Sequence, residues 1–299
     1  VLFLVHRVTL AKQAKKSFEK VFDKKVTMGL VGAGSYEYEK DYVFATVETL
    51  NRDTHLFQYQ PDAFDCIILD EAHHSSNNIY TKVIDYFNPK LFLGMTATPD
   101  KRDDNQEGKN IYEIFHYQIA HEIRLQQAME DNLLCPFHYF GISEVVSLDD
   151  KTLQAAKLTD DEFNQLTSDE RVRHVIEQSE YYGYSGDRVR GLVFCSRVKE
   201  CEELSRKFNA LGYRTIALSG ADSEEKRQKA FERLAMDEAD TTEEMQPLDY
   251  IFSRDILNEG VDIVEVNQVI MLRPTQSPIV FIQQLGRGLR KAPGKEYVV

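Results

Sequence analysis

An acidic pair directly follows an apolar run in the first third of the chain. Residues 66–69 read CIIL, and Asp70 and Glu71 come next, with His73 close behind. Adjacent carboxylates repel each other, so a cation or a reacting proton at this position would stabilise them. A phosphate-bound Mg²⁺ would stabilise one carboxylate, and a water molecule awaiting deprotonation would use the other. Acidic pairs also end strands that have no such role, so this pair needs support from other motifs.

Two other motifs place polar residues where an apolar run stops. The stretch GMTATP contains Thr96 and Thr98 on either side of an alanine, and a plain strand-to-turn transition is the alternative interpretation. The stretch RDILNEGVDI follows the run DYIFS and contains Gly260 and Asp262. These motifs become informative together, because the carboxyl ends of parallel strands share one edge of a sheet, where ligands bind.

The stretch QQLGRGLR carries two arginines close to the end of the chain. Arg287 and Arg290 are three residues apart, so they share one face if the segment is helical. Two guanidinium groups on one face suit a polyphosphate, although a pair of surface arginines is the ordinary alternative. Gly286 and Gly288 lower helix stability, which favours a close approach of the backbone to another group.

The elements that must position these residues follow an alternating pattern. Apolar runs expected to form strands occur at 1–5, 41–47, 65–70, 90–96, 190–196, 214–219, 248–253 and 266–274. Stretches with helical spacing lie between them, among them 9–22, 198–212 and 224–235. This alternation predicts an α/β fold with parallel sheets that are flanked by helices. The polar stretch 143–190 separates two such series, which predicts one lobe at 1–145 and a helical connector with a second lobe at 146–299.

Composition limits the classes of protein to which the chain could belong. Its 299 residues are 42% hydrophobic and 28% charged, and no apolar run is long enough to span a bilayer, so no membrane partner is expected. The formal net charge of −13 counts against nucleic-acid binding by bulk electrostatics, but a local groove remains possible. The four cysteines show no C-x-x-C spacing, which predicts neither a zinc site nor a disulfide framework and favours a reduced, cytoplasmic setting.

The motifs together resemble those of superfamily 2 helicases and translocases of the DEAH type. DEAH (70–73) is similar to motif II, TATP to motif III, LVFCSRVKE to motif IV, RDILNEGVDI to motif V and QQLGRGLR to motif VI. HRVTLAKQ resembles motif Ia, and ATVETL a motif between Ia and II. The stretch LLCPFHYFGI and residues 272–299 carry a narrower likeness to bacterial helicases that also contain a phospholipase-D-like nuclease domain and an uncharacterised C-terminal domain. The order of the motifs covers nearly the whole chain.

The resemblance implies two RecA-like lobes that hydrolyse ATP with Mg²⁺ in the cleft between them. Asp70 would hold Mg²⁺ through water, Glu71 would deprotonate the attacking water, and His73 would link the nucleotide to the second lobe. Arg287 and Arg290 would reach the γ-phosphate as arginine fingers.

The resemblance also implies coupling and binding roles for other residues. Thr96 and Thr98 would couple the lobes. Contacts to the nucleotide are implied for Gln283, Gly260 and Asp262. Contacts to the nucleic-acid backbone are implied for Arg7, Thr46 and Ser196. Because such contacts are mostly to phosphates, binding is expected to be independent of sequence, and DNA is the expected partner.

The sequence departs from the family in one respect. No G-x-x-x-x-G-K-[ST] motif occurs, and the glycine-rich stretch GLVGAGS (29–35) lacks the lysine of a P-loop. We therefore expect the 299 residues alone to be inactive as an ATPase and expect further domains of the same polypeptide at both ends. Two alternatives stay open: the motor of a restriction-type system that translocates duplex DNA without unwinding it, and a nucleic-acid-binding module without catalysis.

Overall fold

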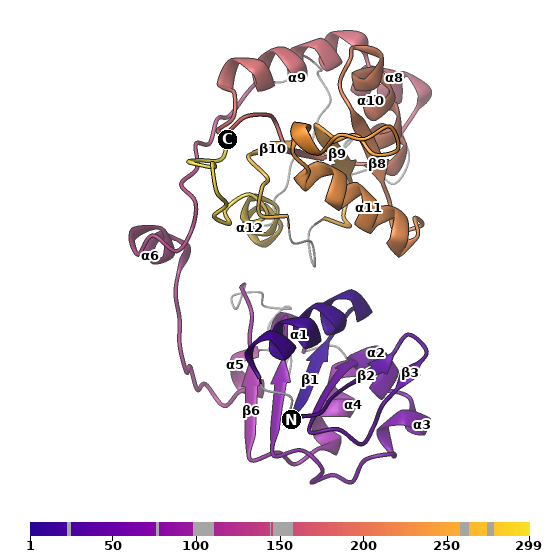
Figure 1. Ribbon diagram of the computed structural model, residues 1–299, viewed down its shortest axis with the longest axis vertical. Helices are drawn as coiled ribbons and strands as arrows, with labels where there is room; N and C mark the ends of the chain where they lie inside the picture. Colours follow the sequence, from indigo (N-terminus) through magenta and orange to yellow (C-terminus); the bar gives the residue numbers. More distant parts are fainter. Residues whose placement is uncertain are drawn as a thin grey trace. The chain divides into compact units, whose positions relative to one another are not determined.

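The computed structural model describes residues 1–22, 25–75, 78–97, 111–143, 145, 158–257, 263–273 and 278–299 (Figure 1). It divides into two compact units, Val1–Glu122 and Ile123–Val299. The sequence placed this boundary near residue 145. The residues before it instead join the second unit, where Cys135 N donates to Leu289 O at 2.7 Å and Phe137 forms a parallel bridge with Val298. This pairing joins distant parts of the chain, so local composition could not reveal it.

The first unit is built on a six-stranded sheet. Its strands are β1 (Leu2–Val5), β2 (Met28–Gly32), β3 (Ser35–Tyr36), β4 (Tyr42–Thr46), β5 (Cys66–Leu69) and β6 (Leu91–Gly94). They lie in the order β3-β2-β4-β1-β5-β6, and every neighbouring pair is parallel except β2 and β3. All four strands predicted in this part of the chain are present. The hairpin β2–β3 was not predicted, and it includes the glycine-rich stretch that the sequence excluded as a P-loop.

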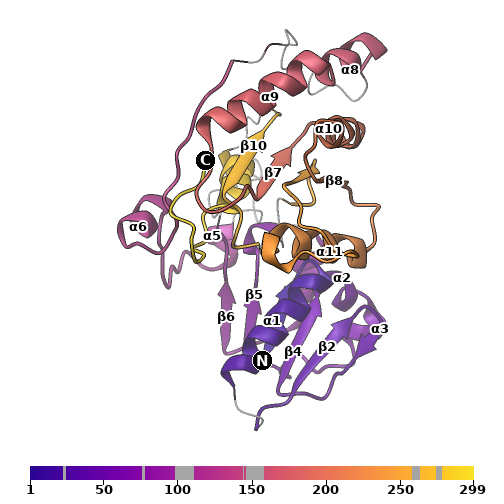
Figure 2. The same ribbon diagram turned by 45° about the horizontal axis from the view of Figure 1, so that its top comes forward.

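Helices cover both faces of this sheet. They are α1 (Val8–Val21), α2 (Val47–Leu50), α3 (Asp53–Leu56), η1 (Ala72–His74), α4 (Asn78–Tyr86) and α5 (Ile111–Ile114). Phe3 and Val5 of β1 belong to a buried cluster with Ala11 of α1, which lies across the strands (Figure 2). Leu2 and Leu4 point the opposite way, into a cluster that contains residues of α2, α3 and α4. The run is apolar at every position because both of its faces are buried.

The second unit contains a four-stranded parallel sheet in the order β10-β7-β9-β8. Its strands are β7 (Gly191–Phe194), β8 (Thr215–Leu218), β9 (Tyr250–Ser253) and β10 (Gln268–Met271). Its helices are α6 (Leu125–Glu130), α8 (Asp160–Leu166), α9 (Asp169–Tyr182), α10 (Val198–Ala210), α11 (Glu224–Ala235), η2 (Glu238–Asp240) and α12 (Pro278–Gly286). One buried cluster joins the sheet to α9 and α10, and another joins its opposite face to α11. Every strand predicted in this unit is present, which confirms the α/β class.

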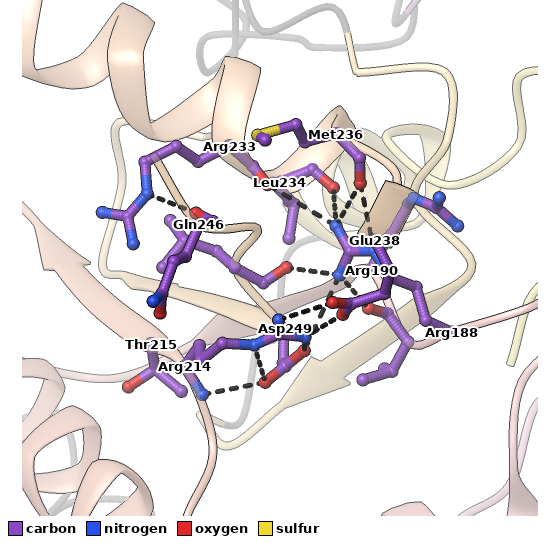
Figure 3. Close-up of polar contacts among 12 residues, drawn as sticks. Arg188, Arg190, Arg214, Thr215, Arg233, Leu234, Met236, Glu238, Gln246 and Asp249 are labelled. Carbon is purple, nitrogen blue, oxygen red and sulfur yellow. Dashed lines mark hydrogen bonds and ion pairs between the residues drawn. The ribbon is translucent and has the colours of Figure 1, made fainter. Parts of the chain in front are cut away.

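A network of arginines holds the amino-terminal edge of the second sheet (Figure 3). Arg188 is buried and donates to Leu234 O and Met236 O at the end of α11, both at 2.7 Å, and to Leu248 O at 2.7 Å. Arg214 makes a two-pronged contact with Asp249, at 2.7 and 3.2 Å. These residues precede β7, β8 and β9, so the network lies at the opposite edge from the polar residues that follow the strands. We assign it to stability.

Candidate functional site

In the first unit the acidic pair lies at the carboxyl edge of the sheet. The amide of Asp70 continues the ladder by donating to Leu4 O of β1 at 2.9 Å. On the other side, Met95 N donates to Leu69 O at 2.9 Å, and Ala72 N donates back to Met95 O at 2.8 Å. The chain after β5 is therefore fixed between β1 and β6, at the edge where ligands of parallel sheets bind.

Glu71 adopts a backbone conformation that is unusual for its residue type. Its φ and ψ are both +50°, in the left-handed region. A side chain with a Cβ loses about 1–2 kcal/mol in this region, and such strain gathers at functional sites. The turn brings the Glu71 carboxylate to 3.2 Å from His73 Nδ1, and His73 Nδ1 lies 3.1 Å from Thr96 Oγ1. Three of the predicted site residues thus form one contact chain that joins the ends of β5 and β6.

Burial and charge make the ionised state of Asp70 costly. Burial raises the pKa of the Asp70 carboxyl above its usual value, and the neighbouring charge of Glu71 raises it further. The amide of Glu71, which donates to Asp70 Oδ1 at 3.0 Å, opposes this rise, as do His6 and His73. A cation beside Asp70 would remove the penalty.

The donor set around Asp70 fits Mg²⁺ of the kind that is bound together with a nucleotide. Within the described ranges, no group of three or more His, Cys, Asp or Glu side chains is arranged to hold a metal ion by itself. Mg²⁺ keeps several waters and is commonly held by one or two carboxylates together with substrate phosphates. A single half-buried carboxylate at a strand end suits this mode and does not suit a metal cage built from protein alone.

Two residues predicted to contact nucleic acid also lie at the carboxyl ends of strands in the first sheet. Arg7 precedes α1 directly and is half-buried. Thr46 ends β4, is 4% exposed, and accepts a hydrogen bond from Thr49 N as the N-cap of α2. The Thr46 hydroxyl also lies 2.7 Å from Thr49 Oγ1. Thr46 therefore positions α2, and Thr49 is a neighbouring hydroxyl that sequence reasoning missed.

The second unit gathers polar groups at the carboxyl ends of β7 and β9. Ser196 follows β7, and Ser253 is the last residue of β9. Both hydroxyl oxygens are buried, and within the described part of the chain neither has a hydrogen-bond partner. Buried hydroxyls of this kind are uncommon and often mark places where a ligand or water binds. Ser253 was not predicted as a site residue, although a serine at the end of the run YIFS was a visible signal.

The predicted arginines lie at and beyond the end of α12. Arg287 Nε donates to Gln283 O at 3.3 Å, so the Arg287 side chain folds back along the helix. Arg290 is exposed. Gly288 is needed for packing, because a Cβ there would lie 2.7 Å from Val298 Cγ1, whereas a Cβ at Gly286 would meet nothing within 4 Å. The close approach at Gly288 is to a valine side chain, and the predicted role of the two glycines beside a polyphosphate stays a prediction.

Some predicted residues cannot be placed. Thr98, Gly260 and Asp262 lie outside the described residues. Their roles stay predictions from the resemblance.

Two family models of known proteins match this chain, one in each half. Residues 1–101 match the family model of the type III restriction enzyme res subunit, and residues 171–292 match the helicase conserved C-terminal domain. The second match begins inside α9, so it covers the second sheet with part of the connector.

Relatives and solved structures cover almost the whole chain. From Saccharomyces cerevisiae, "Putative ATP-dependent helicase IRC3" is 25% identical over 99% of this chain and 42% of its own length. The type I restriction enzyme EcoAI endonuclease subunit of Escherichia coli is 23% identical over 97% of this chain and 38% of its own length. The solved structure of the type ISP restriction-modification enzyme LlaBIII bound to DNA has a TM-score of 0.64 at 18% identity, over 99% of this chain and 24% of that one. The chain spans less than half of each of these proteins. These likenesses confirm RecA-like α/β domains.

Proposed function

We propose that this chain, which belongs to the superfamily 2 helicases and translocases, is the motor core of a longer polypeptide that hydrolyses ATP to move along DNA. The observation that carries this proposal is the contact chain Glu71–His73–Thr96 beside Asp70, at the carboxyl edge of the first sheet. We take Glu71 as the base, Asp70 as the carboxylate that holds the metal, and Thr96 as the coupling residue, and the contacts of His73 with Glu71 and Thr96 support this assignment. ATP, bound with Mg²⁺, would supply the phosphoryl group and its free energy of hydrolysis.

In this account the residues of the first unit prepare the attacking water. Glu71 accepts the proton of the water, and its left-handed turn brings its carboxylate to His73. His73, 4% exposed, contacts both that carboxylate and the Thr96 hydroxyl through the same ring nitrogen, Nδ1. A change at Glu71 would thus reach the loop after β6. That this stretch works as a DEAH box is part of the same proposal.

The second unit would supply positive charge and backbone contacts. Arg287 and Arg290 carry the charge that offsets the developing negative charge of the γ-phosphate. Gln283, Gly260 and Asp262 would contact the nucleotide. Each of these assignments is inferred from the family motifs.

Nucleic acid would run along the residues that follow the strands. Arg7 supplies a cation, and the hydroxyls of Thr46 and Ser196 can bond phosphate without added charge. We propose DNA because the restriction-modification enzyme LlaBIII, to which this chain is similar, was solved bound to DNA. A cytoplasmic setting and flanking domains on the same polypeptide belong to the same proposal.

Two assays on the native full-length protein test this function. We expect ATPase activity that rises when DNA is added, and displacement of a DNA strand from a duplex in the presence of ATP. If a triplex-forming strand is displaced but a duplex strand is not, the protein is a translocase of the restriction type. ATPase activity that does not respond to any nucleic acid would contradict the proposal and favour a binding module.

A further inference from the structure

One ion pair in the second unit is buried completely. Arg171, in the first turn of α9, lies with Nη1 2.9 Å from Glu200 Oε1 in the first turn of α10. Their side chains are 1% and 0% exposed. Removing two charges from water costs several kcal/mol for each ion, and apolar residues of similar size often serve stability equally well. Stability alone therefore does not explain why this position carries an ion pair.

Three hydrogen bonds tie the pair to the backbone. Arg171 Nη1 also donates to Leu166 O, the last residue of α8, at 2.8 Å. Its Nη2 donates to Leu272 O, directly after β10, at 3.1 Å. Glu200 Oε2 accepts a hydrogen bond from the amide of Ser196, two residues after the end of β7, at 2.8 Å. Two of these three anchors lie at the carboxyl edge of the sheet.

The two edge anchors belong to neighbouring strands that lead to different parts of the proposed site. β7 and β10 pair in parallel, and Leu272 N donates to Phe194 O at 2.8 Å. Ser196 opens the loop that is proposed to contact nucleic acid. The chain after Leu272 leads to α12, the next described element, which carries Gln283. The ion pair thus connects the nucleic-acid loop to the base of the segment that bears the arginines.

We propose that Arg171 and Glu200 are positioning residues, whose buried ion pair fixes the Ser196 loop to the end of β10 so that nucleic-acid binding is transmitted to α12 and to the arginines that follow it. This inference rests on the proposed function. It assigns no contact with ATP or DNA to either side chain. Both act through the backbone groups that they hold.

The test uses the full-length protein with the double substitution Arg171→Met and Glu200→Met. Methionine is of similar length, and removing both charges together leaves no unpaired ion, so folding is retained. We expect the DNA concentration for half-maximal ATPase stimulation to rise about tenfold, the size of one lost charge-assisted hydrogen bond. The KM for ATP and the ATPase rate without DNA should change less than twofold, because the nucleotide contacts of the first unit are untouched.

A matched control removes the same charges from a surface pair. Arg206 and Glu203 lie on α10 with their closest atoms at 2.6 Å, and the Arg206 side chain is 66% exposed. The double substitution Arg206→Met and Glu203→Met should leave the half-maximal DNA concentration unchanged. If the double variant does not fold, Glu200→Gln is the second test. Its amide NH₂ group must face either the Ser196 amide or Arg171, both of which are donors, so one of the two hydrogen bonds is lost. It should shift the half-maximal DNA concentration in the same direction.

The outcomes separate this inference from the function on which it depends. A wild-type protein without DNA-stimulated ATPase contradicts both. If wild type is stimulated and the folded double variant has the same half-maximal DNA concentration, only the positioning role is overturned. A fall in basal and stimulated rates by one common factor, with unchanged DNA dependence, also overturns it, because that pattern reflects a loss of folded protein.

Discussion

Asp70 and Glu71 occupy positions that work against stability. The pKa of the Asp70 carboxyl is raised by burial and by the charge of Glu71, and the backbone of Glu71 is left-handed. Both features lower the free energy of unfolding at neutral pH. Residues that are kept at such a cost are usually functional, and replacing them often stabilises a protein while removing its activity.

Asp70→Asn should raise the melting temperature at pH 7 and abolish ATP hydrolysis. The neutral amide removes the repulsion with Glu71, and its oxygen can still accept the Glu71 amide. The pKa of Asp70 is higher in the folded state than in the unfolded state. The fold therefore loses stability as pH rises from the unfolded pKa to the folded pKa, and the loss is complete above the folded pKa. Melting curves of both forms should be recorded from pH 4 to 8. The melting temperature of Asp70→Asn should exceed that of wild type by a few degrees at pH 7, and this difference should disappear toward pH 4. A variant that melts below wild type at pH 7 would contradict this account.

Lys295 offers a second pH-dependent test at a single residue. Its ammonium donates to Val266 O at 3.0 Å and to Gly288 O at 3.1 Å, so it ties the segment after β9 to the glycine that follows α12. Burial lowers the pKa of Lys295 to about 8. The folded value lies below that of an unfolded lysine, about 10.4, so the unfolded state binds more protons between these values and stability rises with pH there.

Comparison of wild type with Lys295→Met isolates this effect. The free energy of unfolding of wild type, relative to the variant, should increase between pH 8 and 10, as measured by urea denaturation. Lys291, which is exposed and bonds Asn132 Oδ1 at 2.6 Å, gives the matched control Lys291→Met. A difference between wild type and Lys295→Met that does not vary with pH would mean that Lys295 keeps an ordinary pKa.

At the scale of elements, the Arg188 side chain caps the carboxyl end of α11. A guanidinium that bonds the last carbonyls of a helix satisfies acceptors that have no partner within the helix and complements the negative end of its dipole. The side chain is 6% exposed. Its acceptors are on Leu234, Met236 and Leu248, which lie before and after the acidic loop between α11 and β9.

Arg188→Met should therefore lower the free energy of unfolding by about 2–4 kcal/mol, since several buried carbonyls lose their donor at once. Arg206→Met, which removes an exposed arginine from helix α10, should cost less than about 1 kcal/mol. Urea denaturation of the three forms measures both values. Equal, small losses in the two variants would show that solvent replaces the Arg188 contacts.

The sequence predicted elements better than it predicted the contacts between them. Apolar runs such as 248–253 reveal strands because both of their faces are buried. The hairpin β2–β3 was missed because glycines at 29, 32 and 34 weaken its strand signal, and its turn needs positive φ at Gly32 and Gly34. The partners of Arg188 and Arg171 lie far away in the sequence, so nothing local distinguished these arginines from surface residues.

At the scale of the whole molecule, the net charge of −13 restricts how DNA can bind. The proposed contacts to nucleic acid include few cations: Arg7 is charged, whereas Thr46 and Ser196 are neutral. Few counterions are then released on binding.

Within the described residues, no helix has the length and apolar character needed to cross a membrane.

The salt dependence of DNA binding should accordingly be shallow. For duplex DNA the slope of log K against log salt concentration is about −0.9 for each neutralised phosphate, so we expect a slope on the order of −2 to −4 for these 299 residues. Arg7→Ala should flatten it by about one and weaken all sequences alike. Fluorescence titrations of labelled duplexes at several salt concentrations provide the slope. A steep slope, or a loss confined to particular sequences, would place the DNA elsewhere.

The site itself was predicted by residue type and motif order, and its geometry was not. Motif spacing located Asp70, Glu71, His73 and Thr96, which the structure brings together. It could not show that Glu71 is left-handed or that Thr46 serves as a helix cap, because both depend on how the chain turns at the strand ends. Glu200 ends the stretch that resembles motif IV, but no role was predicted for it, and Arg171 lies outside every motif.

Glu71→Gln in the full-length protein is the most direct test of the central claim. Glutamine keeps the shape of the side chain and an oxygen for His73, but it cannot accept the proton of the attacking water. Removing a general base costs roughly 100-fold or more, so kcat for DNA-stimulated ATP hydrolysis should fall by at least this factor while ATP still binds with similar affinity. Glu39→Gln, an exposed position in the same unit, should leave kcat unchanged. An unchanged kcat in Glu71→Gln would contradict the account, because the residue at the centre of the proposed site would then have no part in hydrolysis.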